Sequence, residues 1–203
     1  MRVTPQAEDS ARLQKLFGDL YAERMPRDEM RAAVFEVIRQ RVRCARVSMW
    51  KFEGSSDDLE LVCFATKTAR GDFRFEIQGR LQRDEFIHYL NGLVDSGIYM
   101  STDALNDPVL QAMREHYLIA HNVVALLAAA VIVNNRTYGM VCCEEPYRRE
   151  WQVGDATAMR AIINKISLLM WNAPDAKLLN SPSLPLRAMR AEPEEPPPDP
   201  RRR

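Results

Sequence analysis

The stretch "NVVALLAAAVIVNNRTYGMVCCEE", residues 122–145, decides the fold. Its apolar first half is shorter than the roughly 18 unbroken apolar residues of a membrane span and is typical of a buried strand. "NNRTYG" indicates a turn, because asparagine tolerates positive φ at little cost. "YGMVCCEE" then pairs back, so the sequence predicts a long, buried antiparallel hairpin.

Two further strands are expected before this hairpin. "ARVSMWKF" at residues 45–52 and "LELVCFATK" at residues 59–67 are rich in β-branched and aromatic residues, and the turn signal "GSSDD" lies between them. This pattern predicts a second antiparallel pair. A third short strand, "FRFEI" at residues 73–77, is expected to follow.

Apolar residues repeat at helical spacing in the segments around the strands. Helices are expected over residues 9–25, from Pro26 to about Val42, and over residues 83–95, 109–118 and 155–171. Gly97 is suited to a left-handed helix cap. This order predicts an α+β fold, in which a central antiparallel sheet of about five to six strands is flanked by helices.

Composition limits the class of protein. The chain of 203 residues is 46% hydrophobic, which favours one core with extensions. Lys plus Arg and Asp plus Glu number 28 each, so no basic excess points to nucleic acid or an anionic membrane. We expect an amphipathic helix in residues 1–26, one domain in residues 27–172 and a disordered, Pro-rich tail in residues 173–203.

The cysteines Cys44, Cys63, Cys142 and Cys143 show no CxxC spacing and lie in apolar surroundings. This usage suits buried thiols in a reducing compartment, and together with the lack of an apolar signal core it favours a cytoplasmic protein. Cys142 and Cys143 are expected on opposite faces of one strand, so they cannot chelate a metal together. The alternative to buried packing is a redox-responsive thiol at either position.

The stretch "IYMSTDALNDPVLQA", residues 98–112, poses a choice between a metal loop, a catalytic pair of carboxylates and a capped turn. Asp103 and Asp107 are suited to accept backbone N–H bonds, and Asp107 precedes Pro108 as a helix N-cap does. The stretch lacks the alternating acidic pattern of a calcium loop, and His116 and His121 are five residues apart rather than four. We therefore expect capping and no metal site.

These segments together resemble a GAF domain of the bacterial stand-alone type, over roughly residues 27–171. "ARVSMWKF" resembles the first strand of the family, and "IYMSTDALNDP" resembles its isoleucine, Asp-Ala and Asp-Pro stretch. "HYLIAHNVVALLAAAVIVNNRTYGMVCCEEPYRREW", residues 116–151, resembles the last part of the family pattern. The resemblance implies a sensory, ligand-binding or regulatory domain whose terminal helices pack together on one face of the sheet.

The resemblance also suggests where a ligand would lie. The helix over residues 83–95 would cover one face of the sheet, where aromatic residues could line a cavity with polar groups at its rim. Core packing is the alternative for each aromatic residue. The candidate ligand-binding residues are Ser48, Trp50, Phe52, Phe64, Thr66, Phe86, Tyr89, Ser101, Asp103 and Glu144.

The sequence thus favours a sensor that binds a nucleotide second messenger or a metabolite and signals to a separate output protein through its terminal helices. A ligand-free dimerisation or adaptor scaffold is the alternative, and no catalytic residues are recognised. The ligand, and so any cofactor, is unknown. A homodimer is expected through the apolar stripe of the first helix and through the last helix. The stripe consists of Leu13, Leu16, Phe17 and Leu20.

Overall fold

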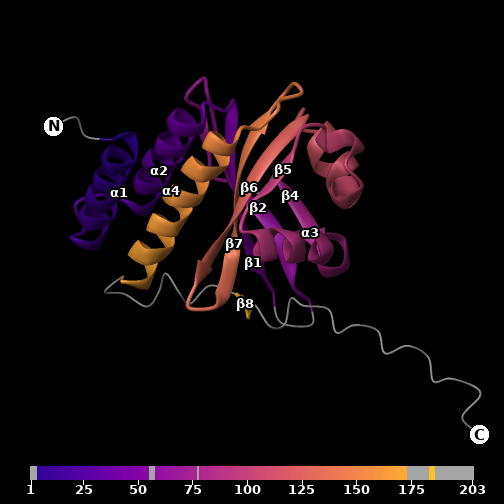
Figure 1. The fold of residues 1–203 in the computed structure, drawn as a ribbon. Helices are drawn as coiled ribbons and strands as arrows, with labels where there is room; N and C mark the ends of the chain where they lie inside the picture. The colour runs from indigo at the N-terminus through magenta and orange to yellow at the C-terminus, as the bar shows by residue number, and fades with distance from the viewer. Residues whose placement is uncertain (1–3, 55–57, 77, 173–182, 186–203) are drawn as a thin grey trace, which may run out of the picture.

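A computed structural model describes residues 4–54, 58–76, 78–172 and 183–185 of the chain. The fold is a central antiparallel sheet between two layers of helices (Figure 1). Helices α1, α2 and α4 lie on one side of the sheet, and α3 and the segment after β5 lie on the other. The predicted α+β class and the flanking helices are therefore confirmed.

The predicted helices and the strands of the two predicted hairpins occur in the expected order with shifted ends, whereas β5 and β8 were not predicted. The helices are α1 (Pro5–Tyr21), α2 (Arg27–Val42), α3 (Arg83–Ser96) and α4 (Val153–Trp171), with 3-10 helices at Ala104–Asn106 and Pro108–Met113 and a π-helix at Arg114–Ile119. The strands are β1 (Arg46–Glu53), β2 (Glu60–Thr68), β3 (Phe73–Arg74), β4 (Gly79–Gln82), β5 (Tyr99–Ser101), β6 (Ala125–Val133), β7 (Arg136–Glu145) and β8 (Leu184–Pro185). The short third strand expected over residues 73–77 is present as β3 at Phe73–Arg74, and β4, which was not predicted, also pairs with β2.

The predicted β6–β7 hairpin is present. Its turn consists of Asn134 and Asn135, whose φ values are 47° and 56°, and β7 begins directly after them. Two consecutive left-handed residues give the turn whose twist matches that of the flanking strands. The turn is thus two residues long, which is shorter than the six-residue segment expected from the sequence.

The main path of the sheet runs β3-β2-β1-β7-β6-β5, with β4 paired to β2 and β8 paired to β7. This path agrees with the five to six strands predicted. Every pairing is antiparallel, and β1 and β7 lie in the middle of the path. Because helices cover both faces, the central strands are buried on both sides.

Strand alternation divides the core into two parts. We call the part between the sheet and α1, α2 and α4 the helical-layer core; it includes Phe17, Val34 and Ile162. The part between the sheet and α3 is the roof core, and it includes Trp50, Phe86 and Tyr117. The N- and C-terminal helices therefore pack together on one face of the sheet, as predicted.

The apolar stripe of α1 is used inside the chain. Leu13, Leu16 and Phe17 are buried in the helical-layer core, where α1 packs on α2 and α4, and Leu20 packs against that core. These side chains are therefore covered within the protomer and are not exposed for the expected dimer contact. The stripe already has its partner within the protomer.

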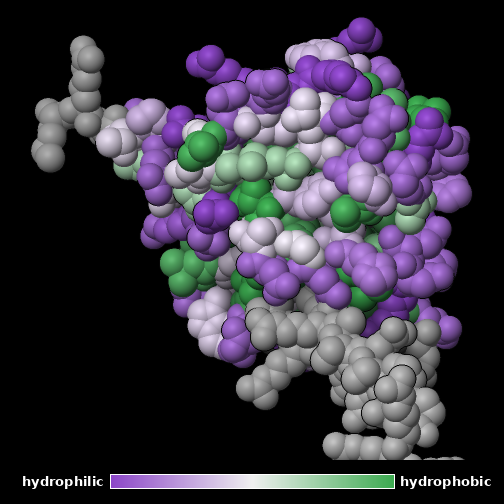
Figure 2. Space-filling view, turned by 45° about the vertical axis from the view of Figure 1, so that its right-hand side comes forward, coloured by the Kyte–Doolittle hydropathy of each residue, from purple (hydrophilic) through white to green (hydrophobic). Residues whose placement is uncertain are grey.

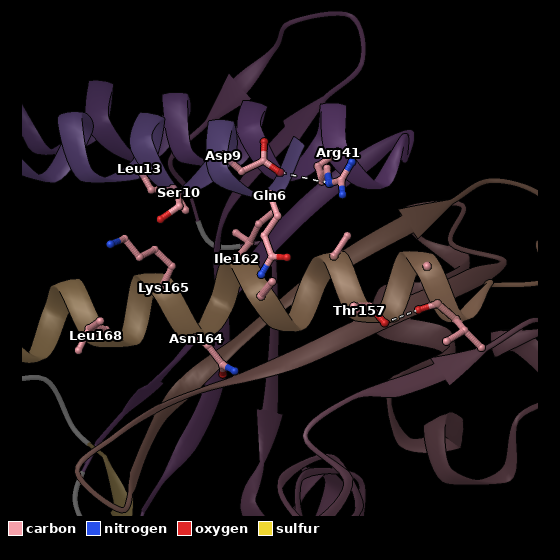
Figure 3. A pocket seen from close by; sticks show the side chains of 14 residues that line it. Gln6, Asp9, Ser10, Leu13, Arg41, Thr157, Ile162, Asn164, Lys165 and Leu168 are labelled. Atoms are coloured by element: carbon pink, nitrogen blue, oxygen red, sulfur yellow. Dashed lines mark hydrogen bonds and ion pairs between the residues drawn. The ribbon is translucent and has the colours of Figure 1, made fainter. Parts of the chain in front are cut away.

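A groove with a volume of about 530 Å³ runs between α1 and α4 (Figure 3). Gln6, Asp9 and Ser10 line its α1 side, and Thr157 and Lys165 lie on the α4 side. An ion pair of 3.2 Å between Asp9 and Arg41 crosses from α1 to α2 beside the groove. The outer surface where α1 meets α4 thus combines polar side chains with apolar ones, among them Val153 and Leu168.

The predicted helix signals have two outcomes. Gly97 ends α3 in the left-handed conformation with φ 72°, as predicted. Residues 109–118 were expected to form one short α-helix, but this segment divides into the 3-10 helix Pro108–Met113 and the π-helix Arg114–Ile119. None of the helices in the described part of the chain is both long enough and apolar enough to cross a bilayer.

The C-terminal end of the described chain contacts the sheet. Leu184 is buried in the roof core and pairs with Thr137 of β7, and the Arg136 guanidinium donates hydrogen bonds to Ser183 at 2.7 and 2.8 Å. The expectation that everything after residue 172 lies outside the fold is therefore wrong for residues 183–185. The rest of the expected tail, residues 173–182 and 186–203, lies outside the described residues.

We expect Leu184→Ala to destabilise the protein by about 2 kcal/mol, because the change removes buried methyl groups. In a chain of this length the melting temperature should fall by roughly 4–8 °C. Val109→Ala, at a side chain that is 43% exposed, is the control and should change the melting temperature by less than about 2 °C. Thermal unfolding followed by circular dichroism measures both, and equal melting temperatures would show that β8 is not packed.

Candidate functional site

The aromatic candidates from β1 and α3 meet in the roof core. Trp50, Phe52, Phe86 and Tyr89 are all buried there, and Phe52 contacts Phe86 with ring centroids 5.9 Å apart. Trp50 and Phe52 share a face because side chains alternate along β1, and α3 covers that face. The structure thus brings these four predicted residues together.

A cluster of polar side chains lies next to these aromatics on the same face. The Glu144 carboxylate accepts hydrogen bonds from Ser48 Oγ at 2.5 Å and from the Tyr117 hydroxyl at 2.8 Å. It also forms an ion pair with Arg46. Trp50 Nε1 donates to Ser48 Oγ at 3.2 Å, which links the aromatic core to the cluster. We call Arg46, Ser48, Tyr117 and Glu144 the polar cluster.

The register of the sheet explains this arrangement. Arg46 pairs directly with Glu144, and Ser48 pairs with Cys142 in the next row of the same face. Directly opposed residues in an antiparallel pair point to the same side of the sheet and lie close enough to interact. Tyr117 comes from the π-helix that covers these rows, and its ring contacts Trp50 at a centroid distance of 4.6 Å.

The environment of the cluster is mainly apolar. Glu144 is 1% exposed and Tyr117 is buried to the same degree. Burial acts to lower the pKa of Arg46, but the carboxylate of Glu144 outweighs it and the pKa of Arg46 is raised. Burial raises the pKa of Tyr117, and Glu144 adds to this effect. At neutral pH, Arg46 therefore carries its charge and Tyr117 keeps its proton.

Stability alone does not account for such a cluster. A buried ion pair can often be replaced by well-packed apolar residues with no loss of stability, because desolvation offsets the attraction between the charges. Apart from the polar cluster, the roof core consists of buried aliphatic, aromatic and cysteine side chains. The cluster is therefore the part of this face whose chemistry suits recognition of a polar molecule.

A hollow of about 450 Å³ leads from the surface to the cluster. Arg46 and Glu144 line it, together with Thr68 of β2 and His121. Thr68 Oγ1 is buried and has no hydrogen-bond partner among the described residues. The ring of His121 is held in place, since its Nε2 lies 2.8 Å from the carbonyl oxygen of Gln78.

The outer side of the roof core can be seen in Figure 2. Hydrophilic residues cover most of this view, and the hydrophobic residues lie in smaller groups between them. The aromatic residues of the roof core are thus buried and not exposed to solvent. A ligand would reach Ser48 or Trp50 through the hollow or by movement of α3 and the segment after β5.

Two candidates on β2 have different outcomes. Thr66 pairs with Ser48 and so faces the polar cluster. Phe64 lies in the helical-layer core, on the opposite face, so the expectation that it joins Trp50 and Tyr89 is wrong. The physical reason is a β-bulge: Met49 pairs with Ala65 but Trp50 pairs with Cys63, which leaves Phe64 as the extra residue.

The candidates near residue 100 are peripheral. Ser101 pairs with Leu126 and is buried at the end of β5, but its carbonyl oxygen rather than its side chain accepts the hydrogen bond from Trp151 Nε1, at 3.2 Å. Asp103 forms an ion pair with Arg148 and accepts a hydrogen bond of 2.8 Å from the Asn106 side chain. None of these contacts reaches the polar cluster.

The capping hypothesis for the two aspartates is half correct. Asp107 accepts the backbone N–H of Val109 at 3.0 Å and the Tyr99 hydroxyl at 2.7 Å, so it caps the 3-10 helix that begins at Pro108. Asp103 makes no side-chain cap bond, and its expected role as a cap is wrong. The carboxylate instead ties the 98–112 stretch to Arg148.

Three residues of the site were not among the candidates. Arg46 is two residues before Ser48, so strand alternation could have found it. Tyr117 and His121 come from the π-helix and the turn after it, where side-chain direction cannot be obtained from a regular period. No sequence signal assigns them to this face.

The four cysteines are buried, as expected. Cys142 lies in the roof core and Cys143 in the helical-layer core, which confirms that they face opposite sides of β7. Burial raises the pKa of Cys63 to about 12, so its thiol keeps its proton at neutral pH. Across the described residues, no three His, Cys, Asp or Glu side chains gather as a metal site requires.

We expect Glu144→Gln to destabilise the fold by about 3–5 kcal/mol, because it leaves the charge of Arg46 buried without its counter-ion. Replacing Arg46 and Glu144 together by methionine should recover most of this loss. Glu150→Gln, at an exposed position, is the matched control and should change stability by less than about 0.5 kcal/mol. Urea unfolding measures all three, and a Glu144→Gln variant as stable as its parent would contradict the buried pair.

The comparisons with known proteins agree with this architecture. The family model of the GAF domain matches residues 26–170, and no curated protein matches the sequence. The chain is similar in structure to the blue-light-absorbing form of the PixJ GAF domain of Thermosynechococcus elongatus, at 19% identity and a TM-score of 0.55, over 68% of this chain and 84% of that one.

Two further structures are similar. One is the phycoerythrobilin-bound GAF domain of a cyanobacterial phytochrome, at 13% identity and a TM-score of 0.62, over 85% of this chain and 97% of that one. The other is the chromophore-binding domain of the bacteriophytochrome RpBphP3 of R. palustris, at 12% identity and a TM-score of 0.58, over 82% of this chain and 60% of that one. These likenesses concern the fold, and the family match covers well over half of the sequence. The chain therefore belongs to the GAF domain family.

Proposed function

We propose that this GAF domain is a sensory domain that binds a small polar molecule on the face of the sheet covered by α3. The observation that carries the proposal is the polar cluster, which is buried among aromatic residues and adjoins a hollow of about 450 Å³. A few convergent polar groups in an otherwise apolar cavity are typical of small-molecule sites. Similar folds that bind phycoerythrobilin or another chromophore support a ligand in this family.

The residues of this chain do not fit a covalently held bilin. Such a link needs an accessible thiol, and all four cysteines are buried. Burial also raises the pKa of Cys63, the thiol nearest to the Tyr117 hydroxyl at 3.7 Å. We therefore favour a ligand held without a covalent bond, a nucleotide second messenger or a metabolite.

A donor-rich, partly flat molecule suits the cluster best. Glu144 and Ser48 supply acceptor oxygens, Arg46 supplies N–H donors, and Trp50 offers an aromatic surface. Binding would require Tyr117 or Arg46 to exchange a bond with Glu144 for a bond with the ligand. Because Tyr117 belongs to a π-helix, this exchange would also shift the segment that covers the face.

A ligand of the cluster should raise the melting temperature. At 100 times its dissociation constant, a ligand that binds only the folded state adds about 2.7 kcal/mol, or roughly 5–10 °C for a domain of this size. Differential scanning fluorimetry would test purines, cyclic mononucleotides and dinucleotides, aromatic acids and tetrapyrroles. Tyr117→Phe removes only the hydroxyl at the cluster and should weaken binding, whereas Thr157→Ala, on α4, should not.

The ligand-free scaffold is the second candidate function. It gains support if no compound shifts the melting curve and the native mass equals the bare chain or its multiple. The exposed apolar residues Val153, Leu168 and Trp171 on α4 favour this candidate, since unpartnered apolar residues on one helix are typical of an interface. The sensory proposal includes the same contact, through which the domain would signal to a second copy and to a separate output protein.

We expect a homodimer that depends on the outer face of α4. Leu168→Glu should give monomers without unfolding, because this side chain is 52% exposed. Phe17→Glu should instead unfold the protein, since it places a charge in the helical-layer core. Light scattering at micromolar concentration, combined with circular dichroism, separates the two results. A parent protein that is monomeric under these conditions would rule out the dimer.

A further inference from the structure

The opposite face of the sheet carries an apolar crevice that the proposed function does not use. It lies between α2, α4 and the strands, and Val34, Met49, Val131 and Val141 are among the residues that line it. All of these belong to the helical-layer core or pack against it. The volume of the crevice is about 120 Å³. This is somewhat less than the roughly 150 Å³ of a dry apolar cavity that binds benzene, so the group that enters can be no larger than one ring or a short branched chain.

The mouth of the crevice is basic. Arg27, Arg31 and Lys51 line it, and no carboxylate is among its lining residues in the described part of the chain. Arg31 lies over the ring of Phe64 at 5.5 Å and over that of Phe75 at 5.0 Å, and the ammonium group of Lys51 lies 5.3 Å from the ring of Phe64. Cations and aromatic rings therefore meet at the opening.

Two carboxylates stand beside the three cations of the mouth, and one of them, Glu53, is shared with Arg80. Arg31 pairs with Asp28 at 3.0 Å and Lys51 pairs with Glu53 at 2.8 Å, and both acids stand outside the crevice lining. The Arg31 side chain is only 24% exposed, so its guanidinium has lost part of its hydration, and this burial lowers its pKa. An anion at the mouth would restore the lost interaction, and an anion with an apolar group would also fill the crevice.

The wall of the crevice can adapt to such a group. Met30, Met49 and Met170 line it, and methionine side chains are flexible and adjust to irregular shapes. The β-bulge at Phe64 contributes as well, since it turns this ring toward the crevice rather than toward the roof core. The β-bulge that turns Phe64 away from the roof core thus places its ring at the edge of the crevice.

We propose that the crevice between α2 and the sheet is a second ligand site, for a small aromatic or branched-chain monocarboxylate whose apolar group enters the crevice and whose carboxylate binds Arg31 and Lys51. The site lies on the face opposite the polar cluster, so it stands or falls independently of the proposed function. β1 contributes to both faces, with Met49 and Lys51 here and Ser48 and Trp50 there.

The experiment is an NMR titration of the full chain with phenylacetate, compared with 2-phenylethanol and 2-phenylethylamine as uncharged and cationic analogues and with 4-methylpentanoate as the branched-chain acid. Saturable shifts are expected for at least one of the two acids, with a dissociation constant of about 1 mM or lower. The neutral and cationic analogues should bind at least about tenfold more weakly, because they lack the charge-assisted bonds.

Variants place the binding at the crevice. Arg31→Gln should weaken binding of the acid about tenfold, and Val34→Phe should abolish it by filling the space. Arg12→Gln is the control. It changes an exposed arginine on α1 that donates a hydrogen bond to Gln40 and does not line the crevice, so this variant should bind the acid as the parent does. If Val34→Phe does not fold, the double variant of Arg31 and Lys51 to Gln decides, since both side chains reach the surface.

Three results would overturn the proposal. Shifts that do not saturate for either acid would show a packing void only. Equal affinity for phenylacetate and 2-phenylethanol would show that the basic residues at the mouth do not bind the carboxylate. Unchanged affinity in the Arg31 and Lys51 variants would place the acid elsewhere on the protein.

Discussion

The register of β1 against β7 is the constraint on which the rest of the structure depends. It is held at Gly139, whose φ is 142°, and a β-carbon on this residue would lie 1.9 Å from the carbonyl oxygen of Trp50. Only glycine lets the two strands approach in this way. The approach fixes Arg46 opposite Glu144 and decides which side chains of both central strands face each core.

Much of the fold could be predicted from the sequence because it depends on local patterns. The hairpin is indicated by a long apolar run and the two asparagines, and α4 is indicated by its helical period. The opposite orientation of Cys142 and Cys143 is a consequence of strand alternation alone. These features need no knowledge of the elements on which each segment packs.

The candidate site was harder to predict because it depends on irregular backbone. One extra residue at Phe64 inverts the face of that side chain, and no residue type marks a bulge in advance. Tyr117 contacts Glu144 from a π-helix, and the sequence shows no hydrophobic pattern from which a π-helix could be predicted. The partner of the apolar stripe at Leu13 and Phe17 could not be predicted for another reason. Periodicity identifies an apolar helix face, but it cannot distinguish an intramolecular partner from a second copy of the chain.

The two faces of β1 also limit how this strand can move. Ser48 and Trp50 face one core while Met49 and Lys51 face the other, so a slip of one residue would exchange the two sets. Such a slip would place Lys51 among the aromatic rings and Trp50 beneath the helical layer. A slip of β1 by one residue is therefore strongly disfavoured. Movements that keep the register of β1 are limited to small changes of its tilt and pleat.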